Sequence, residues 1–143
     1  MTTPEDTDIE SGTVLQPRFD SSGLITAMVV SAEDFAPLML AHMNREALDR
    51  TLETGKAHFY SRSRQEIWLK GGTSGNVLDV QEMRIDCDQD AVWLAVRVAG
   101  HGAACHTGQR SCFYRKIVGD SGSARLERTD DPPLFSPKDV YSS

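Results

Sequence analysis

Short apolar runs separated by polar turns dominate the chain, and they predict more strand than helix. The runs GLITAMVV (residues 23–30) and APLMLAHM (residues 36–43) are rich in β-branched or bulky side chains, which favours two buried strands. Further strands, separated by glycine-containing turns, are predicted for residues 57–63, 66–70, 77–85, 91–98 and 112–117. The pattern therefore predicts an α+β fold, a strand-rich single domain with one clear helix.

The one clear helix is predicted directly after the second of these strands. Asn44 can cap its N-terminus, and Met43 and Leu48 occupy the two positions of a hydrophobic staple. Gly55 can end the helix, because glycine readily adopts the left-handed conformation that follows a last helical turn. These signals place the helix between Asn44 and Gly55.

Composition divides the chain into three parts. Residues 1–16 are acidic and polar, which predicts a disordered N-terminal tail. Residues 17–118 contain the predicted strands and the helix, and they form the expected domain. Residues 119–143 are turn-rich and contain no long periodic segment, so we expect a C-terminal extension that is an ordered coil or a tail. With 143 residues, the chain can bury one core but not two.

Charge and cysteine content exclude several classes of protein. The formal net charge of −6 argues against a general nucleic-acid binder, since such proteins carry a basic excess for the phosphates. No apolar run approaches the roughly 20 residues of a membrane span, and the first residues lack the pattern of a signal peptide. Three cysteines, an odd number, do not predict a disulfide framework. We therefore expect a cytoplasmic protein with free thiols and with no membrane or nucleic-acid partner.

The three thiols are the first candidates for chemistry. Cys105 and Cys112 lie seven residues apart with His106 beside the first, and Cys87 precedes them in the chain. Three thiolates without an obvious fourth protein ligand suit a catalytic zinc ion, whose fourth position is kept for water. The spacing alone equally favours three buried thiols without a metal, because free cysteine is commonly buried.

The stretch DCDQD places carboxylates on both sides of Cys87. In a straight strand, Asp86, Asp88 and Asp90 would share one face about 7 Å apart, whereas a bend would let them meet. Oxygen ligands suit hard cations such as Mg²⁺. A solvated acidic turn is the commoner explanation of an isolated pattern of this kind, since charged side chains are mostly exposed.

A third group of polar residues surrounds the glycine-rich stretch GGTSG. Cationic and aromatic side chains precede it and hydroxyls lie within it, which predicts a phosphate cradle, with further positive charge from Arg110 and Arg115. The candidate substrate-binding residues are Arg62, Arg64, Trp68, Lys70, Thr73, Ser74, Gly75, Asn76 and Arg110. A flexible hairpin turn is the alternative for the stretch taken alone.

Four motifs in this order resemble phosphoribosyl-AMP cyclohydrolase, the enzyme of histidine biosynthesis that opens the adenine ring of phosphoribosyl-AMP. They are MNREALDRTLETGKAHFYSRSR, WLKGGTSGN, DCDQDA and ACHTGQRSCFYR, and the resemblance runs from about Gly23 to Ile117. It implies one Zn²⁺ per subunit and Mg²⁺, with Cys87, Cys105 and Cys112 as zinc ligands and Asp86, Asp88 and Asp90 as magnesium ligands. It also implies an intertwined homodimer with active sites at the subunit interface and zinc ligands from both chains.

The reaction implied by the resemblance is hydrolysis of the N1–C6 bond of the adenine ring by a zinc-activated water, with Mg²⁺ neutralising substrate phosphate. Three thiolates weaken zinc as a Lewis acid, so we expect a general base to assist. His106 is the candidate because it is adjacent to a zinc ligand and imidazole is the usual base near neutral pH. Its alternative role is to orient the loop.

Two positions depart from the family pattern. The family usually has glycine where this chain has Gln89, and frequently glutamate where it has Gly72. Glycine reaches backbone angles that glutamine avoids, so the first departure bears on the bend of the aspartate loop. The second removes a carboxylate near the cradle, and no catalytic acid is assigned there. Many relatives are fused to a pyrophosphohydrolase, for which the 26 residues after Ile117 are too few, so we expect a single reaction step.

Two other classes of function fit parts of the pattern. A zinc nucleobase deaminase also adds water to a purine, but its H-x-E and P-C-x-x-C signatures are absent from the sequence. A non-catalytic interaction domain stabilised by zinc would need only the cysteines. Turnover of phosphoribosyl-AMP distinguishes the enzyme from the interaction domain.

Overall fold

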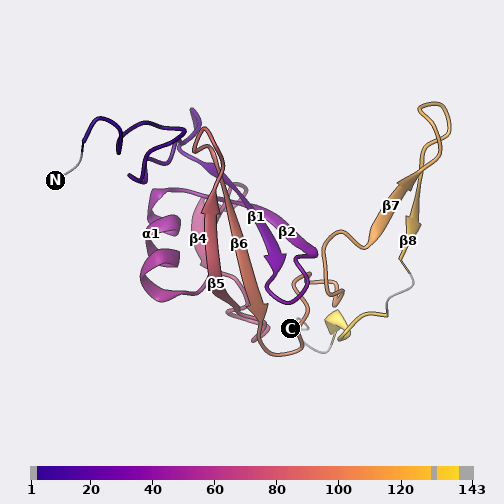
Figure 1. Ribbon diagram of the computed structural model, residues 1–143. Coiled ribbons are helices and arrows are strands. Elements are labelled where there is room, and N and C mark those ends of the chain that lie inside the picture. The colour runs from indigo at the N-terminus through magenta and orange to yellow at the C-terminus, as the bar shows by residue number, and fades with distance from the viewer. Residues whose placement is uncertain (1–2, 130–131, 139–143) are drawn as a thin grey trace.

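The computed structural model describes residues 3–129 and 132–138, and its main element is a four-stranded sheet. The strands β1 (Ile25–Ser31), β2 (Pro37–Met43), β5 (Leu78–Ile85) and β6 (Ala91–Val98) lie in the order β2-β1-β6-β5 (Figure 1). β1 and β6 run parallel in the centre, and both outer pairs are antiparallel. β2 and β5 are therefore the two edges of this sheet.

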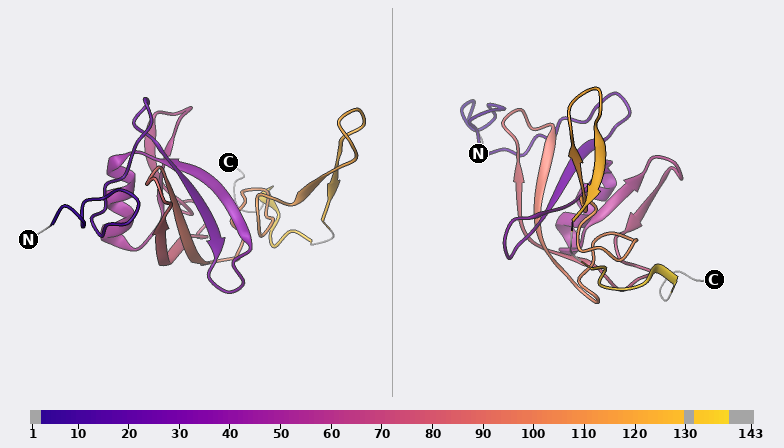
Figure 2. Two further views of the ribbon diagram at one scale, coloured as in Figure 1. Left: turned by 45° about the horizontal axis from the view of Figure 1, so that its top comes forward. Right: turned by 90° about the vertical axis from the view of Figure 1, so that its right-hand side faces the viewer.

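One face of the sheet is covered by α1 (Arg45–Thr54), as Figure 2 shows, and by the hairpin of β3 (His58–Ser61) and β4 (Glu66–Leu69). Alternate residues of a strand point to the same side, so β1 and β6 each present a row of apolar side chains to this face. The resulting core includes Ile25, Val29, Leu48, Phe59, Leu94 and Val96. The prediction of a strand-rich α+β domain is confirmed.

The ends of α1 follow the sequence signals. The Asn44 side chain accepts a hydrogen bond from the Ala47 backbone N–H at 2.8 Å, which satisfies a donor that the first helical turn leaves free. Gly55 has a φ of 73° and donates its N–H to the Thr51 carbonyl at 2.9 Å. Both predicted caps are confirmed.

A second hairpin, formed by β7 (Arg115–Val118) and β8 (Arg125–Arg128), projects away from the sheet (Figures 1 and 2). The expectation of coil or tail after residue 118 was wrong for β8. This strand is four residues long and exposed throughout, so it lacks the alternation that predicts a half-buried strand. A turn at Asp120, whose side chain accepts from the Gly122 N–H at 3.1 Å, brings it against β7.

Residues 3–16, for which composition predicts a disordered tail, form a series of turns beside the loop between β5 and β6. Their hydrogen bonds are mostly internal, such as those from the N–H groups of Thr13 and Val14 to the Asp6 carbonyl at 2.9 and 3.0 Å. Within the described residues, no helix has the length and apolarity needed to cross a membrane.

The N-terminal cap of α1 gives a test of the fold. We expect Asn44→Ala to lower the free energy of unfolding by about 1 kcal/mol, because the Ala47 N–H loses its acceptor. Urea denaturation measures the change, and Asn44→Ser, which keeps a capping oxygen, is the matched control. Equal midpoints for the alanine and serine variants would contradict the capping role.

Candidate functional site

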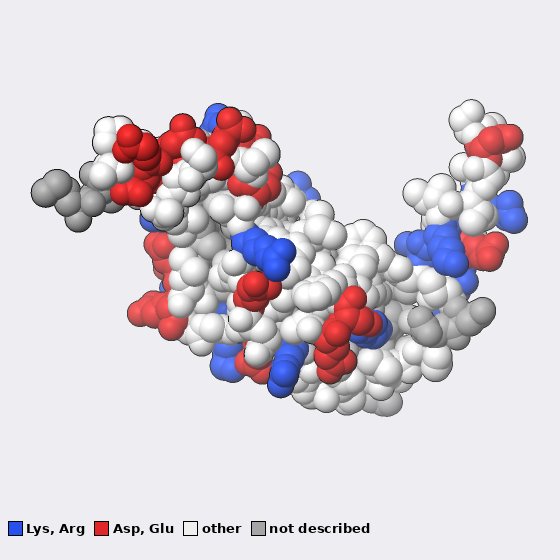
Figure 3. Space-filling view, viewed as in Figure 1, with Lys and Arg blue, Asp and Glu red and all other residues white. Residues whose placement is uncertain are grey.

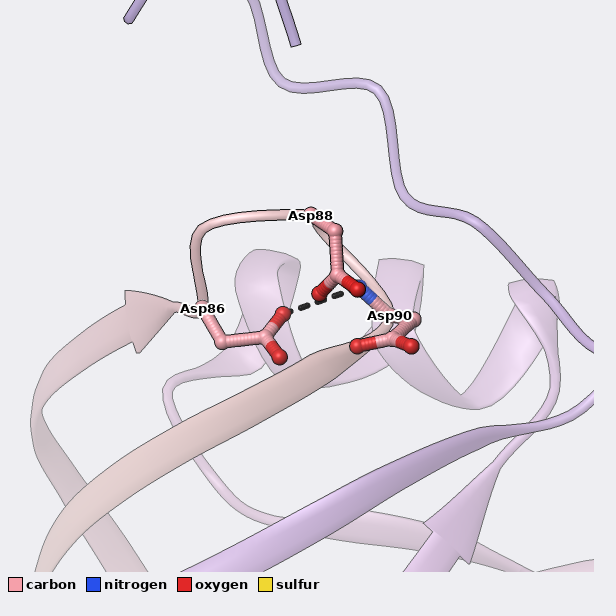
Figure 4. A group of neighbouring side chains, drawn as sticks. All are labelled: Asp86, Asp88 and Asp90. Atoms are coloured by element: carbon pink, nitrogen blue, oxygen red, sulfur yellow. Dashed lines mark hydrogen bonds between the residues drawn. The ribbon is translucent and has the colours of Figure 1, made fainter. Parts of the chain in front are cut away.

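The loop between β5 and β6 brings three carboxylates together. Figure 4 shows the side chains of Asp86, Asp88 and Asp90 pointing toward one another, with a ligand oxygen of each within 4.8 Å of the others. The chain turns at Gln89, which has a φ of 58°, so the aspartates meet instead of following a straight strand. The structure thus contains the bend that a shared cation requires.

Hydrogen bonds inside this loop make its carboxylates unequal. The Asp86 side chain accepts from the backbone N–H groups of Asp90 at 2.9 Å and Ala91 at 3.1 Å. Desolvation raises the pKa of Asp86, but hydrogen bonds from Asp90 and Ala91 outweigh it and leave the pKa below its usual range. Hydrogen bonds with Asp88 and Asp86, together with their charges, raise the pKa of Asp90 to about 6. Below about pH 6, a proton is therefore shared within the loop.

The donor set of this loop fits a hard divalent cation. Opposite ligands of one Mg²⁺ are about 4.2 Å apart, because each Mg–O distance is about 2.1 Å. The aspartate oxygens all lie within 4.8 Å of one another, a limit only slightly above that value. The carboxylates lie on the surface, where a bound cation could keep several waters as Mg²⁺ prefers.

Two of the three thiols lie together in the loop between β6 and β7. Cys105 is buried, and Cys112 is exposed and donates its backbone N–H to the Leu38 carbonyl of β2 at 2.7 Å. The Thr107 hydroxyl donates to the Cys105 sulfur at 3.0 Å. Desolvation, followed by the charge of the neighbouring Cys105, raises the pKa of the Cys112 thiol to about 12. A metal cation between the sulfurs would offset this repulsion and hold both as thiolates.

Cys87 does not join the thiol pair within one chain. It follows β5 at one edge of the sheet, whereas Cys112 is bonded to β2 at the other edge. Three strand spacings of about 4.8 Å separate the edges by roughly 14 Å, while two sulfur ligands of one zinc are at most about 4.6 Å apart. Among the described residues, the aspartates are the one group of three or more candidate ligands close enough for a metal, and no cysteine belongs to it.

A surface pocket lies beside the thiol pair. Its walls are formed by Trp68 of β4, by Lys70 directly after this strand, by the glycine-rich turn that follows and by the loop that carries His106. Its lining residues are Arg64, Trp68, Leu69, Lys70, Gly71, Gly72, Thr73, Ser74 and His106. Burial lowers the pKa of Lys70, and the thiols of Cys112 and Cys105 act in the opposite direction, so its ammonium lies near both sulfurs.

Other candidate substrate-binding residues lie outside this pocket. Arg62 is exposed in the β3–β4 turn, and Arg110 forms an ion pair with Asp34 at 2.9 Å. Asn76 is buried and accepts from the His101 backbone N–H at 2.6 Å, which ties the glycine-rich turn to the loop after β6. Gly75 is exposed, with a φ of 81°.

Sequence reasoning missed two polar residues that support these loops. Thr107 bonds the Cys105 sulfur, and its position two residues after that cysteine is the signal that could have identified it. Gln89 was noted only as a departure from glycine, yet its side chain is buried and hydrogen-bonded to residues near the N-terminus. Its partners are more than 70 residues away in the sequence, so no local pattern predicts them.

The pocket and the thiols beside it have the features of an enzyme site. A pocket lined by a histidine, a lysine of perturbed pKa and a glycine-rich turn, with two thiols beside it, is typical of an enzyme site. A family model described as phosphoribosyl-AMP cyclohydrolase matches residues 39–114.

Curated relatives carry the same name over most of the chain. The phosphoribosyl-AMP cyclohydrolase of Sinorhizobium medicae is 61% identical over 94% of this chain and 89% of its own length. The enzyme of Agrobacterium fabrum is 57% identical over 94% of this chain and 90% of its own length. The enzyme of Brucella anthropi is 62% identical over 82% of this chain and 84% of its own length. The chain belongs to the phosphoribosyl-AMP cyclohydrolase family, a family of hydrolytic enzymes, which confirms the resemblance found in the four motifs.

The shared proton of the aspartate loop gives a test of its geometry. In the metal-free protein, we expect Asp90 to titrate near pH 6 by carboxyl ¹³C NMR, because Asp88 and Asp86 disfavour its ionised form. Cation binding needs that form, so Mg²⁺ affinity should fall as the pH drops through 6 and level off above it.

The matched variant is Asp88→Asn, which removes the largest cause of the shift and should lower the pKa of Asp90. Titration of wild-type Asp90 at the ordinary aspartate value, near pH 4, would show that the carboxylates do not meet in solution.

Proposed function

We propose that this chain hydrolyses the N1–C6 bond of the adenine ring of 1-(5-phosphoribosyl)-AMP, in histidine biosynthesis, to give the phosphoribosyl-formimino aminoimidazole carboxamide ribotide. The single observation that carries the proposal is the pocket in which His106, Lys70 and the glycine-rich turn lie beside the Cys105–Cys112 pair. The names of the relatives support the same substrate.

Zinc fits the thiols of this chain. Soft sulfur donors select it over harder cations, and the Thr107 hydroxyl that donates to Cys105 stabilises the thiolate form needed for binding. Cys105 and Cys112 would hold it in the pocket wall, with Cys87 as the third ligand. Bound there, it would supply a water of lowered pKa for attack on C6.

His106 is the proposed general base. Its side chain is exposed in the pocket and its neighbour in sequence is a thiol of the pair. It would accept a proton from the attacking water and return it to N1 as the ring opens to a formamidine and a carboxamide. With Gly72 at the position where the family often has glutamate, the pocket offers no carboxylate among its lining residues to share this task.

The glycine-rich turn and its cations suit a phosphorylated ligand. Thr73 and Ser74 bring hydroxyls to the pocket, and Lys70 and Arg64 bring positive charge. Burial disfavours the charged form of Lys70, so a phosphate beside it would restore the ammonium and be held in return. The aspartate loop would hold Mg²⁺, which would supply positive charge to offset further phosphate charge of the substrate.

A homodimer with shared sites would solve the separation of Cys87 from the thiol pair. Two surfaces suit a second copy of the chain. The sheet face opposite α1 exposes the apolar side chains of Met28 and Leu40, and the projecting hairpin exposes Ile117 and Leu126. Figure 3 shows a hollowed, largely uncharged surface between the sheet and this hairpin. An isolated two-stranded hairpin is marginally stable in water, so contacts with a partner would stabilise it.

Turnover of phosphoribosyl-AMP by the purified chain with Zn²⁺ and Mg²⁺ tests the proposed reaction, and His106 tests the mechanism. We expect His106→Ala to lower kcat by about 100-fold or more while zinc content stays unchanged, because general base catalysis contributes at least that much. The control is His58→Ala, which removes an imidazole bonded to the Lys56 carbonyl, outside the pocket. No turnover by the wild type would favour the zinc-stabilised interaction domain, and full kcat in His106→Ala would exclude the base.

Complementation between subunits tests the shared site. Cys87→Ser and Cys105→Ser should each be inactive as homodimers. When both are unfolded and refolded together, one site of each mixed dimer receives both defects and the other receives none. Half of the dimers are mixed at random pairing, so about a quarter of wild-type activity should return.

Each variant refolded alone is the control and must stay inactive. If every site were built within one chain, all sites of the mixture would carry one defect and no activity would return. An inactive mixture in which mass spectrometry detects the mixed dimers would therefore contradict the shared site.

A further inference from the structure

A buried glutamine lies in the middle of the accessible aspartate loop. Gln89 is 5% exposed, whereas its neighbour Asp90 is exposed. The side chain bonds to residues between Ile9 and Gln16, and several residues of this segment line a pocket together with Asp86 and Cys87. The segment near the N-terminus therefore covers one side of the proposed metal loop.

Every polar atom of the Gln89 side chain is bonded to this segment. Its Oε1 accepts from the Gln16 backbone N–H at 2.7 Å, and its Nε2 donates to the Ile9 carbonyl at 3.0 Å and the Val14 carbonyl at 3.5 Å. Its own carbonyl accepts from the Arg18 N–H at 2.7 Å. The side-chain bonds span residues 9–16 and the backbone bond adds Arg18, so one residue holds the stretch 9–18 against the loop.

The backbone of Gln89 explains why these bonds matter to the loop. A φ of 58° lies in the left-handed region, which glycine adopts freely and glutamine disfavours. The same residue donates its N–H to the Asp86 carbonyl at 3.0 Å, closing the turn that brings the carboxylates together. The bonds to the segment hold Gln89 in a conformation that its side chain would otherwise oppose.

Charge gives a second reason to connect the segment with a cation. Glu5, Asp6, Asp8 and Glu10 lie in the same segment, and Glu10 lines the pocket that Asp86 of the loop also lines. Figure 3 shows this acidic concentration at the upper left of the molecule. Like charges repel, so the segment and the loop oppose each other electrostatically unless a cation lies among the carboxylates.

We propose that residues 3–18 form a strap that holds the aspartate loop in its cation-binding shape, and that Gln89 is the positioning residue through which it acts. The strap and a divalent cation then stabilise each other. By thermodynamic linkage, a docked strap raises the affinity for the cation by the same factor by which the cation favours docking. The proposal rests on the proposed Mg²⁺ site and goes beyond it in giving the N-terminal segment a role.

Amide hydrogen exchange of the full-length protein tests the strap without reference to catalysis. In the metal-free wild type, the Gln16 amide should exchange at least about tenfold more slowly than in Gln89→Gly, which keeps the turn but removes the acceptor. Mg²⁺ should slow it further in the wild type, and the Mg²⁺ dissociation constant of Gln89→Gly should rise several-fold in calorimetry.

Gln65→Gly is the matched control. Gln65 also has a positive φ, of 53°, but it is exposed in the β3–β4 turn, so its replacement relieves the same backbone strain without touching the strap. This variant should leave both the Gln16 exchange rate and the Mg²⁺ affinity as in the wild type.

Two results would overturn the proposal. Equal Gln16 exchange rates in the wild type and Gln89→Gly would show that Gln89 does not hold the segment. If Gln89→Gly speeds exchange of the Gln16 amide but leaves the Mg²⁺ dissociation constant unchanged, Gln89 does not position the loop for the cation. Turnover of phosphoribosyl-AMP is measured separately. Failure of the strap proposal changes only the exchange and Mg²⁺-binding results, whereas failure of the proposed function appears as absent turnover by the wild type.

Discussion

The pairing of β1 with β6 in the centre of the sheet is the constraint on which the rest of the structure depends. It places β2 and β5 at opposite edges of the sheet, and the candidate functional groups therefore lie at opposite edges too. One edge carries the aspartate loop and Cys87, and the other carries the thiol pair with its pocket. Hydrogen-bonded strands keep a fixed spacing, so no rearrangement of side chains brings the edges together. Within one chain, the three thiols therefore cannot bind the same zinc ion.

The two loops that carry the candidate metal ligands lack regular secondary structure, and distant segments hold them in place. Gln89 ties the aspartate loop to residues near the N-terminus. After the projecting hairpin, the Leu134 N–H bonds the Gly108 carbonyl at 2.6 Å, and the Phe135 ring lies 4.9 Å from the His101 ring. The terminal segments thus stabilise the two loops that carry the candidate ligands, while the sheet sets the distance between them.

The sequence predicts local features well because their causes are local. The caps of α1 depend on residues within four positions of Asn44 and Gly55, and the strands of the sheet follow the alternation of buried side chains. The meeting of the aspartates needed only a bend, which the turn at Gln89 provides. The exposed β8 and the contacts of Gln89 were not predictable, since pairing with β7 and with residues 9–18 depends on chain topology. Of the candidate residues, Trp68, Lys70 and His106 line one pocket, whereas Arg110 is paired with Asp34 outside it.

The most direct test of the proposed shared site is to determine which chains supply the sulfurs around the zinc. Anomalous diffraction at the zinc absorption edge, measured on crystals of the holoenzyme, locates the ion and the sulfurs that bind it. The shared-site proposal predicts one zinc per subunit at Zn–S distances of about 2.3 Å. Cys105 and Cys112 of one chain and the Cys87 thiol of a second copy would bind it. Three sulfurs from a single chain around the zinc, or zinc bound away from the Cys105–Cys112 pair, would contradict it.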